Sequence, residues 1–264
     1  MDKKAAVEQS EAFESHNVHG RAHCLLLCDH ASNHIPAPYG QLGLPSQDMT
    51  RHIAWDIGAA ELTRALATCL DAPALLARFS RLVIDPNRGL DDPTLVMRLY
   101  DRGVIPGNRM VDDAEIKRRA DLFYAPYDNA ITTAIDLKMK RGLPPALISV
   151  HSFTPEFKGQ ARPWDIGILW NGFDGRLALP LMERLTRHDK LCVGDNLPYS
   201  GALPGDTLDR HAAARGLAHV LIEIRHDLVA APEKILPLAQ FLAAEIKPFL
   251  ADGRLLRVAH FQRP

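Results

Sequence analysis

The feature that most constrains this chain is an alternation of short apolar runs with longer amphipathic stretches. The apolar runs are HCLLLCD (23–29), PALLARF (73–79), RLVIDP (81–86), PALISV (145–150), DIGILW (165–170), KLCVGD (190–195) and HVLIEI (219–224). Brief segments that are apolar on both faces are typical of buried parallel strands. We therefore expect each of these runs to form a strand of one sheet.

The stretches between the runs carry apolar residues at helical spacing. They cover residues 55–70, 112–140, 174–188 and 232–250. Asp112 and Asp113 provide an N-terminal cap for the second stretch, and Gly142 provides a stop. An alternation of strands with helices predicts a three-layer α/β/α fold with a mostly parallel central sheet.

The chain is expected to consist of a flexible amino-terminal segment, residues 1–22, and a single catalytic domain, residues 23–264. No linker, internal repeat or low-complexity tract divides the second part. The amino-terminal segment lacks the apolar region of a signal peptide, and the chain has no apolar run of about 18 residues. These features predict a soluble cytoplasmic protein that does not enter a membrane.

The charge balance indicates the kind of partner. The chain has 31 Lys and Arg against 32 Asp and Glu, a formal net charge of -1. Such a balance argues against nucleic-acid binding and against a polybasic membrane surface, so a small molecule is the expected partner. The four cysteines lack CxxC spacing, which favours reduced thiols over a disulfide framework. The oligomeric state is left open.

Polar and charged side chains gather where the predicted strands end. These residues are Asp29 and His30, Asn87 and Arg88, His151 and Ser152, and Glu223 and Arg225. In open α/β sheets, ligands bind in the crevice beyond the carboxyl ends of the strands. The sequence therefore predicts that these side chains meet at one edge of the sheet.

Histidine is a common zinc ligand, and two histidines follow or end predicted strands. Zinc catalysis needs two or three protein ligands, an open position and a carboxylate that takes a proton from water. We expect His30 and His151 to be ligands, although a single histidine after a strand is often only a hydrogen-bonded loop residue. The third ligand is either Asp56 or Asn33, and Asp56 is favoured because it is anionic. Asp56 could instead interact with a helix dipole.

Glu223 interrupts an otherwise apolar strand, where an unpaired carboxylate would be costly to bury. It is either the partner of Arg225 in a buried ion pair or a general base beside the metal. Asn87 and Arg88 could belong to a turn after Pro86. An arginine also offers the planar fork that binds a carboxylate, so both residues are candidates for substrate binding. Ser152 and Arg225 are further candidates because they follow strand ends of the same sheet.

The ordered motifs CDHASN, FSRLVIDPNRG, ISVHSFTP, GDNLPYSG and HVLIEIRHDL resemble the N-formylglutamate amidohydrolase family. The resemblance covers most of residues 23–250. The layout is also similar to zinc carboxypeptidases, aspartoacylase-type deacylases and zinc cell-wall amidases, which implies a zinc-exopeptidase/phosphorylase-like fold. By this resemblance His30 and His151 would hold Zn²⁺, Glu223 would be the base, and Asn87 with Arg88 would hold a substrate carboxylate.

The implied reaction is hydrolysis of an N-formyl or N-acyl amide by metal-activated water, with Glu223 passing the proton to the leaving amine. The substrate would be a small molecule that is similar to an N-acyl amino acid. The chain reads Asp29-His30-Ala31-Ser32 and Pro126-Tyr127-Asp128 where relatives that act on N-formylglutamate read Pro-His-Ser-Gly and Pro-Tyr-His. The acyl group and the amine are thus left open. Alternatives are a non-catalytic protein that binds an acidic ligand and a peptide or cell-wall amidase.

Overall fold

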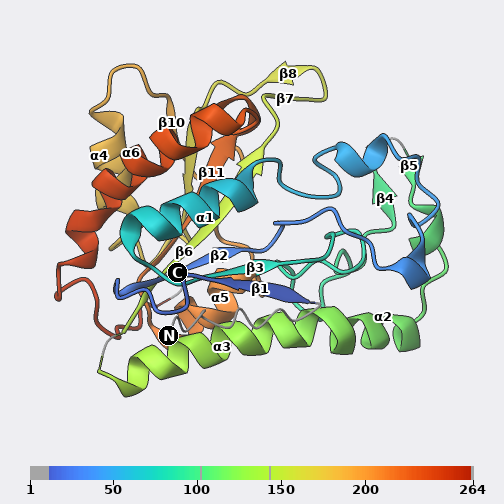
Figure 1. Ribbon diagram of the computed structural model, residues 1–264, viewed down its shortest axis with the longest axis horizontal. Helices are drawn as coiled ribbons and strands as arrows, with labels where there is room; N and C mark the ends of the chain where they lie inside the picture. Colours follow the sequence, from blue (N-terminus) through green and yellow to red (C-terminus); the bar gives the residue numbers. More distant parts are fainter. Residues whose placement is uncertain (1–11, 102, 143, 263–264) are drawn as a thin grey trace, which may run out of the picture.

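The computed structural model describes residues 12–101, 103–142 and 144–262. Seven strands form one sheet in the order β1-β3-β2-β6-β11-β9-β10 (Figure 1). Their bounds are β1 Phe13–His16, β2 Cys24–Cys28, β3 Ala74–Ala77, β6 Ala146–Phe153, β9 Ile166–Leu169, β10 Val193–Asp195 and β11 His219–Arg225. Neighbouring strands are parallel except for the pairs β1 with β3 and β9 with β11. The prediction of a mostly parallel sheet is confirmed.

Helices cover both faces of this sheet (Figure 1). On one face pack α1 (Ala59–Leu70), α4 (Ala178–Thr186) and α6 (Pro232–Leu250). On the other face pack α3 (Ala125–Lys140) and α5 (Thr207–His211). Helix α2 (Asp113–Arg119) continues into α3 through a π-helical turn, Ala120–Tyr124, and its predicted cap is present because the Asp112 side chain accepts from the backbone N–H of Glu115. The fold is a single three-layer α/β/α domain.

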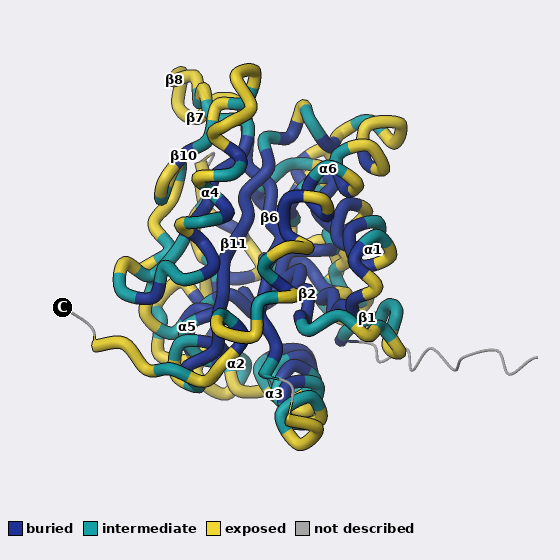
Figure 2. Tube along the Cα trace, turned by 90° about the vertical axis from the view of Figure 1, so that its left-hand side faces the viewer, coloured by how far each residue is buried: buried dark blue, intermediate teal, exposed yellow. Residues whose placement is uncertain are grey.

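The central strands supply alternate side chains to two cores. Leu26 on β2 packs in the core that contains α1 and α6, whereas Leu25 and Leu27 pack in the core that contains α3. This division follows from the period of two along a strand. Strands β2 and β6 are buried over their whole length, and Figure 2 shows them as a dark band through the middle of the molecule.

The run at residues 81–86 is not a strand, contrary to the prediction. Residues 81–83 form a turn that follows Ser80, whose hydroxyl donates to the carbonyl of Ala54 and accepts from the N–H of Leu82. Leu82, Val83 and Ile84 are nevertheless fully buried, because Leu82 packs against residues of the surrounding loops, whereas Val83 and Ile84 pack in the core that contains α3. The apolar character of this run therefore predicted its burial correctly, but the prediction of a strand was wrong.

The predicted flexible segment, residues 1–22, needs a partial correction. Residues 1–11 lie outside the described residues, but Phe13–His16 forms the edge strand β1, which pairs antiparallel with β3. Its Glu14 carboxylate binds the Arg64 guanidinium of α1 at 2.8 and 2.9 Å. The four cysteines, all within the described residues, are free.

Shorter elements complete the described chain. Two small hairpins pair β4 (Leu99–Tyr100) with β5 (Gly103–Val104) and β7 (Glu156–Phe157) with β8 (Gln160–Ala161). Single 3-10 turns occur at Ala37–Tyr39, Asp48–Thr50, Pro106–Asn108, Ala213–Arg215 and His226–Leu228. None of the described helices combines the length and the apolar character that a membrane span requires. Because β2, β6 and β11 are parallel neighbours, their carboxyl ends meet at one edge of the sheet.

Candidate active site

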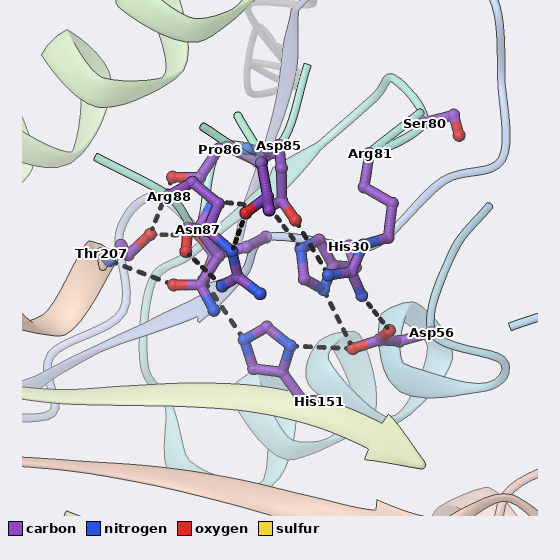
Figure 3. Close-up of polar contacts among 12 residues, drawn as sticks. His30, Asp56, Ser80, Arg81, Asp85, Pro86, Asn87, Arg88, His151 and Thr207 are labelled. Carbon is purple, nitrogen blue, oxygen red and sulfur yellow. Dashed lines mark hydrogen bonds and ion pairs between the residues drawn. The ribbon is translucent and has the colours of Figure 1, made fainter. Parts of the chain in front are cut away.

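Three of the predicted ligands meet at this edge. His30 follows the end of β2, His151 lies in the last part of β6, and Asp56 precedes α1. Their candidate ligand atoms lie within 4.8 Å of one another, and all three residues are buried. The Nδ1 atoms of His30 and His151 face the same oxygen, Oδ2 of Asp56, at 3.3 and 2.8 Å (Figure 3). The backbone fixes this arrangement, because the N–H of Asp56 donates to the carbonyl of His30 at 3.0 Å.

The donor set suits a transition-metal ion. Two imidazole nitrogens and one carboxylate oxygen are ligand types that zinc takes in catalytic sites with three protein ligands. The backbone N–H of Ser152 also points to Asp56 Oδ2, at 3.3 Å, so four polar groups converge on one small volume. The alternative ligand Asn33 is directed elsewhere, since its amide donates to the carbonyl of Met49 at 2.9 Å.

Each histidine has a second carboxylate behind it. His30 Nε2 lies 2.8 Å from Asp85 Oδ1 (Figure 3). His151 Nε2 lies 3.3 Å from Asp29 Oδ2. A carboxylate that accepts from Nε2–H fixes the tautomer and leaves Nδ1 as a lone-pair donor. Both imidazoles are therefore oriented for a metal at Nδ1.

No role was predicted for Asp29 or Asp85 from the sequence, although their positions indicate one. Asp29 and Asp85 each end an apolar run, in CDH and IDPN, and both are fully buried. A buried carboxylate requires a partner. A histidine at the same sheet edge is a partner of the required kind.

Asp29 is the centre of a polar network that links four elements. It accepts hydrogen bonds from the hydroxyls of Tyr127 on α3, Ser149 on β6 and Thr207 on α5, at 3.0 to 3.2 Å. Burial alone would raise the pKa of Asp29, but the hydrogen bond and the charge of His151 hold this pKa below its ordinary value. An ionised Asp29 can then stabilise the imidazole of His151.

Asp85 has a stronger set of donors. It accepts from Arg81 Nη2 at 2.9 Å and, through Oδ1, from the backbone N–H of Asn87 at 2.9 Å. The second bond is the local turn that Asp-Pro-Asn sequences favour. Burial opposes ionisation, but the Arg81 guanidinium and His30 hold the pKa of Asp85 far below its ordinary value. Arg81, which the sequence reasoning missed, also lies 3.7 Å from Asp56 Oδ1.

Glu223 lies beside His151, because the two residues are paired in the register of β11 with β6. Its side chain is buried and lines the same cavity as the three candidate ligands, and its buried Oε2 has no hydrogen-bond partner among the described residues. Burial raises the pKa of Glu223 to about 7, against the opposing influence of His151. A carboxylate that lines a cavity and has a raised pKa can exchange a proton with a molecule bound there.

Arg225 does not take the position that was predicted for it. Its guanidinium binds Asp227 at 2.6 and 3.1 Å and Asp165 at 2.9 Å, and it donates to two backbone carbonyls. It is not the partner of Glu223, and it is not among the residues that line the cavity. Local acids neutralise this arginine, so the structure gives no support for Arg225 as a substrate ligand.

Asn87, Arg88 and Ser152 all line the cavity. Arg88 donates to the carbonyl of Asn87 and to the hydroxyl of Thr94, which leaves part of its fork available. The Asn87 side-chain oxygen accepts from the N–H of Thr207 at 3.1 Å, so its amide N–H groups are directed away from that bond. The hydroxyl of Ser152 donates to the carbonyl of Ile57, so the protein itself already engages this group.

A loop that follows β10 covers part of the cavity, which has a volume of about 210 Å³. Tyr199, Ser200 and Leu203 of this loop are lining residues. Asn196 Oδ1 accepts from the N–H groups of Trp170 and Gly201, which holds the loop against the end of β9. A Cβ at Gly201 would lie 2.3 Å from the Trp170 nitrogen, so only glycine permits this approach.

Comparisons with known proteins identify a family and a fold. The family model for N-formylglutamate amidohydrolase matches residues 22–230. The solved structure of a gene product from Agrobacterium tumefaciens is 35% identical, covers 90% of this chain and 94% of its own, and has a TM-score of 0.85. N-formylglutamate amidohydrolase from Ralstonia eutropha is 23% identical, covers 91% of this chain and 97% of its own, and shares the fold with a TM-score of 0.65. No curated protein matches the chain.

Proposed function

Because the chain belongs to the N-formylglutamate amidohydrolase family, we propose that it is a metal-dependent hydrolase of small N-formyl or N-acyl amino acids. One observation supports this proposal above all others. Two histidines and one aspartate converge beside a buried glutamate that has a free oxygen, within a single cavity. We assign this activity to one catalytic domain, residues 23–264.

In this proposal His30 and His151, through Nδ1, and Asp56 hold one Zn²⁺ ion. When bound, the ion supplies a Lewis acid for the amide carbonyl and lowers the pKa of water. Asp85 and Asp29 keep the two imidazoles in the tautomer that leaves Nδ1 free. The N–H of Ser152, which donates to Asp56 Oδ2, helps to orient this carboxylate.

Glu223 acts as the general base and then as the general acid. It removes a proton from the attacking water and delivers it to the nitrogen of the leaving amine. Burial, which raises the pKa of Glu223 to about 7, makes this carboxylate a stronger proton acceptor than an exposed glutamate. The Glu223 side chain lines the cavity, so its carboxylate is placed to carry this proton.

Arg88 binds the substrate carboxylate, with help from the Asn87 amide. Both side chains line the cavity on the side of Thr207 (Figure 3). The planar guanidinium matches a carboxylate in two parallel hydrogen bonds, which orients the amide as well as attracting it. The small volume of the cavity favours a small molecule over a peptide or a cell-wall polymer.

The proposal is tested by amine release from a panel of N-formyl and N-acyl amino acids, with and without a metal chelator. We expect hydrolysis that the chelator abolishes and that added Zn²⁺ restores. In the Glu223→Gln variant turnover should fall by about 10² to 10⁴-fold, the range for a general acid-base group, with melting temperature and metal content retained. Glu233→Gln, at an exposed position of α6, is the matched control. Near-normal turnover in Glu223→Gln would exclude this role, and no amine release from any compound would exclude the proposed function.

A further inference from the structure

A second cavity adjoins the active site and has no part in the proposed chemistry. Its volume is about 230 Å³. Four residues line both cavities: Leu169 on β9, Leu221 on β11, Leu203 on the loop after β10, and Asp206 at the start of α5. The two cavities are therefore neighbours that share one boundary, and this boundary is made mainly of leucine side chains.

The direction of the second cavity follows from the register of the sheet. Residues at alternate positions of a strand face the same side, so Glu223, Leu221 and His219 form a row on one face of β11. Glu223 lines the first cavity, Leu221 lines both, and His219 lines the second. Each step of two residues covers about 6.6 Å. The second cavity thus begins at Leu221, about 6.6 Å along the strand from Glu223, and reaches His219, about 13 Å from Glu223. A one-carbon formyl group is too short to span this distance.

The walls of this cavity are suited to an uncharged group. Trp170, Phe173 and Leu208 are among its lining residues, and none of the described residues in this lining is a lysine or an arginine. His219 is already satisfied, because its two ring nitrogens meet the carbonyl of Leu217 and the amide of Asn171. The acids are Asp206 and Asp209. A substrate carboxylate placed here would lose water without gaining a cation, and it would face like charge.

In the first cavity, one of the two lining arginines can still neutralise a substrate carboxylate. Arg81 and Arg88 are the arginines of its lining. Arg81 is bound to Asp85 at 2.9 Å and lies 3.7 Å from Asp56, so two carboxylates already neutralise it. Arg88, whose nearest acid is Asp92 at 3.9 Å, retains capacity for one substrate carboxylate.

We propose that the substrate carries one carboxylate, held by Arg88, and one uncharged apolar arm that occupies the second cavity. This inference rests on the proposed amide hydrolysis beside Glu223. The arm is either the amino-acid side chain or the acyl chain. In both cases the preferred substrate differs from N-formylglutamate, which has a one-carbon acyl group and a second carboxylate.

The test compares kcat/KM for matched compounds. One pair varies the side chain, N-formyl-L-glutamate against N-formyl-L-norleucine, and the other varies the acyl group, N-formylglycine against N-hexanoylglycine. Burial of the apolar arm should favour norleucine over glutamate, or hexanoyl over formyl, by about 10- to 100-fold. In the Leu203→Lys variant, which places a cation at the shared boundary, this preference should shrink and N-formyl-L-glutamate should become a better substrate.

The control variant Leu236→Lys adds the same charge at an exposed position of α6 and should leave the preference unchanged. If N-formyl-L-glutamate and N-formylglycine are the better substrates of the natural enzyme, the apolar arm is refuted while amide hydrolysis stands. If none of the four compounds, nor any other N-acyl amino acid, releases an amine, the proposed function fails and this inference fails with it. Melting temperatures of both variants establish that they are folded.

Discussion

The replacement Asp85→Asn removes one charge from the structure without changing the shape of the side chain. Asp85 is 1% exposed and accepts from His30 Nε2 at 2.8 Å and from Arg81 Nη2 at 2.9 Å. Asparagine can still accept one of these bonds, but its amide nitrogen would face a donor. His30 would lose the charge that fixes its tautomer, and Arg81 would be left with only the more distant Asp56.

Two separate estimates give the size of the effect on metal binding. Loss of a hydrogen bond to a charged group costs about 1.5 to 3 kcal/mol. Removal of the carboxylate behind a metal-binding histidine lowers metal affinity by about 10- to 100-fold, which corresponds to about 1.4 to 2.7 kcal/mol. Both ranges lead us to expect that Asp85→Asn weakens Zn²⁺ binding by about 10- to 100-fold.

The assay is a competition between the protein and a chromophoric chelator for Zn²⁺, which gives the Kd directly. The control is Asp91→Asn, an exposed aspartate of the same loop, which should leave the Kd unchanged. Circular dichroism should show that both variants are folded. A Kd for Asp85→Asn equal to that of the natural protein would refute the argument that Asp85 orients a metal ligand.

Three further predictions concern one cavity residue and two ion pairs outside the cavity. Arg88→Lys should lower catalytic efficiency by about 10- to 100-fold and abolish the preference for an N-acyl amino acid over its carboxamide, whereas unchanged discrimination would leave Arg88 with a structural role only. Arg225→Gln should leave kcat/KM unchanged, because Asp165 and Asp227 occupy its guanidinium, and a fall in efficiency with the fold intact would return Arg225 to the active site. Asp128→Asn should lower the melting temperature more at pH 7 than at pH 3. The pKa of Asp128 is lowered by His211 and Arg210 despite partial burial, so its stabilising effect is complete above the unfolded pKa of about 3.9 and is lost as the pH falls below this value and through the lowered folded pKa; a gap at pH 3 as large as that at pH 7 would contradict this reasoning.

The proximity of two candidate ligands, His30 and His151, could be predicted because it depends on the order of the parallel strands. His30 and His151 end apolar runs, and parallel strands place such ends at one edge of a sheet. Glu223 could be placed by the same argument, since an acid in the apolar strand β11 must have a polar environment. The mostly parallel sheet and several of the polar residues at its carboxyl edge could therefore be predicted from the sequence.

Pairings between distant loops could not be predicted in this way. Arg225 follows a strand that leads to the site, yet Asp165, 60 positions earlier in the chain, and the adjacent Asp227 direct its side chain away. The run 81–86 is a turn whose apolar residues are buried in two hydrophobic clusters, and periodicity does not distinguish this burial from that of a strand. Its Asp85 completes the site through His30, a contact that no local pattern specifies.

The most direct test of the account is the amount of metal bound by the natural protein and by the double variant His30→Ala, His151→Ala. Equilibrium dialysis against Zn²⁺, followed by elemental analysis, should give one ion per chain for the natural protein and almost none for the double variant. The control His19→Ala, His260→Ala removes two exposed histidines and should retain the ion. Full stoichiometric metal in the His30→Ala, His151→Ala protein would contradict the assignment of the metal centre and the mechanism built on it.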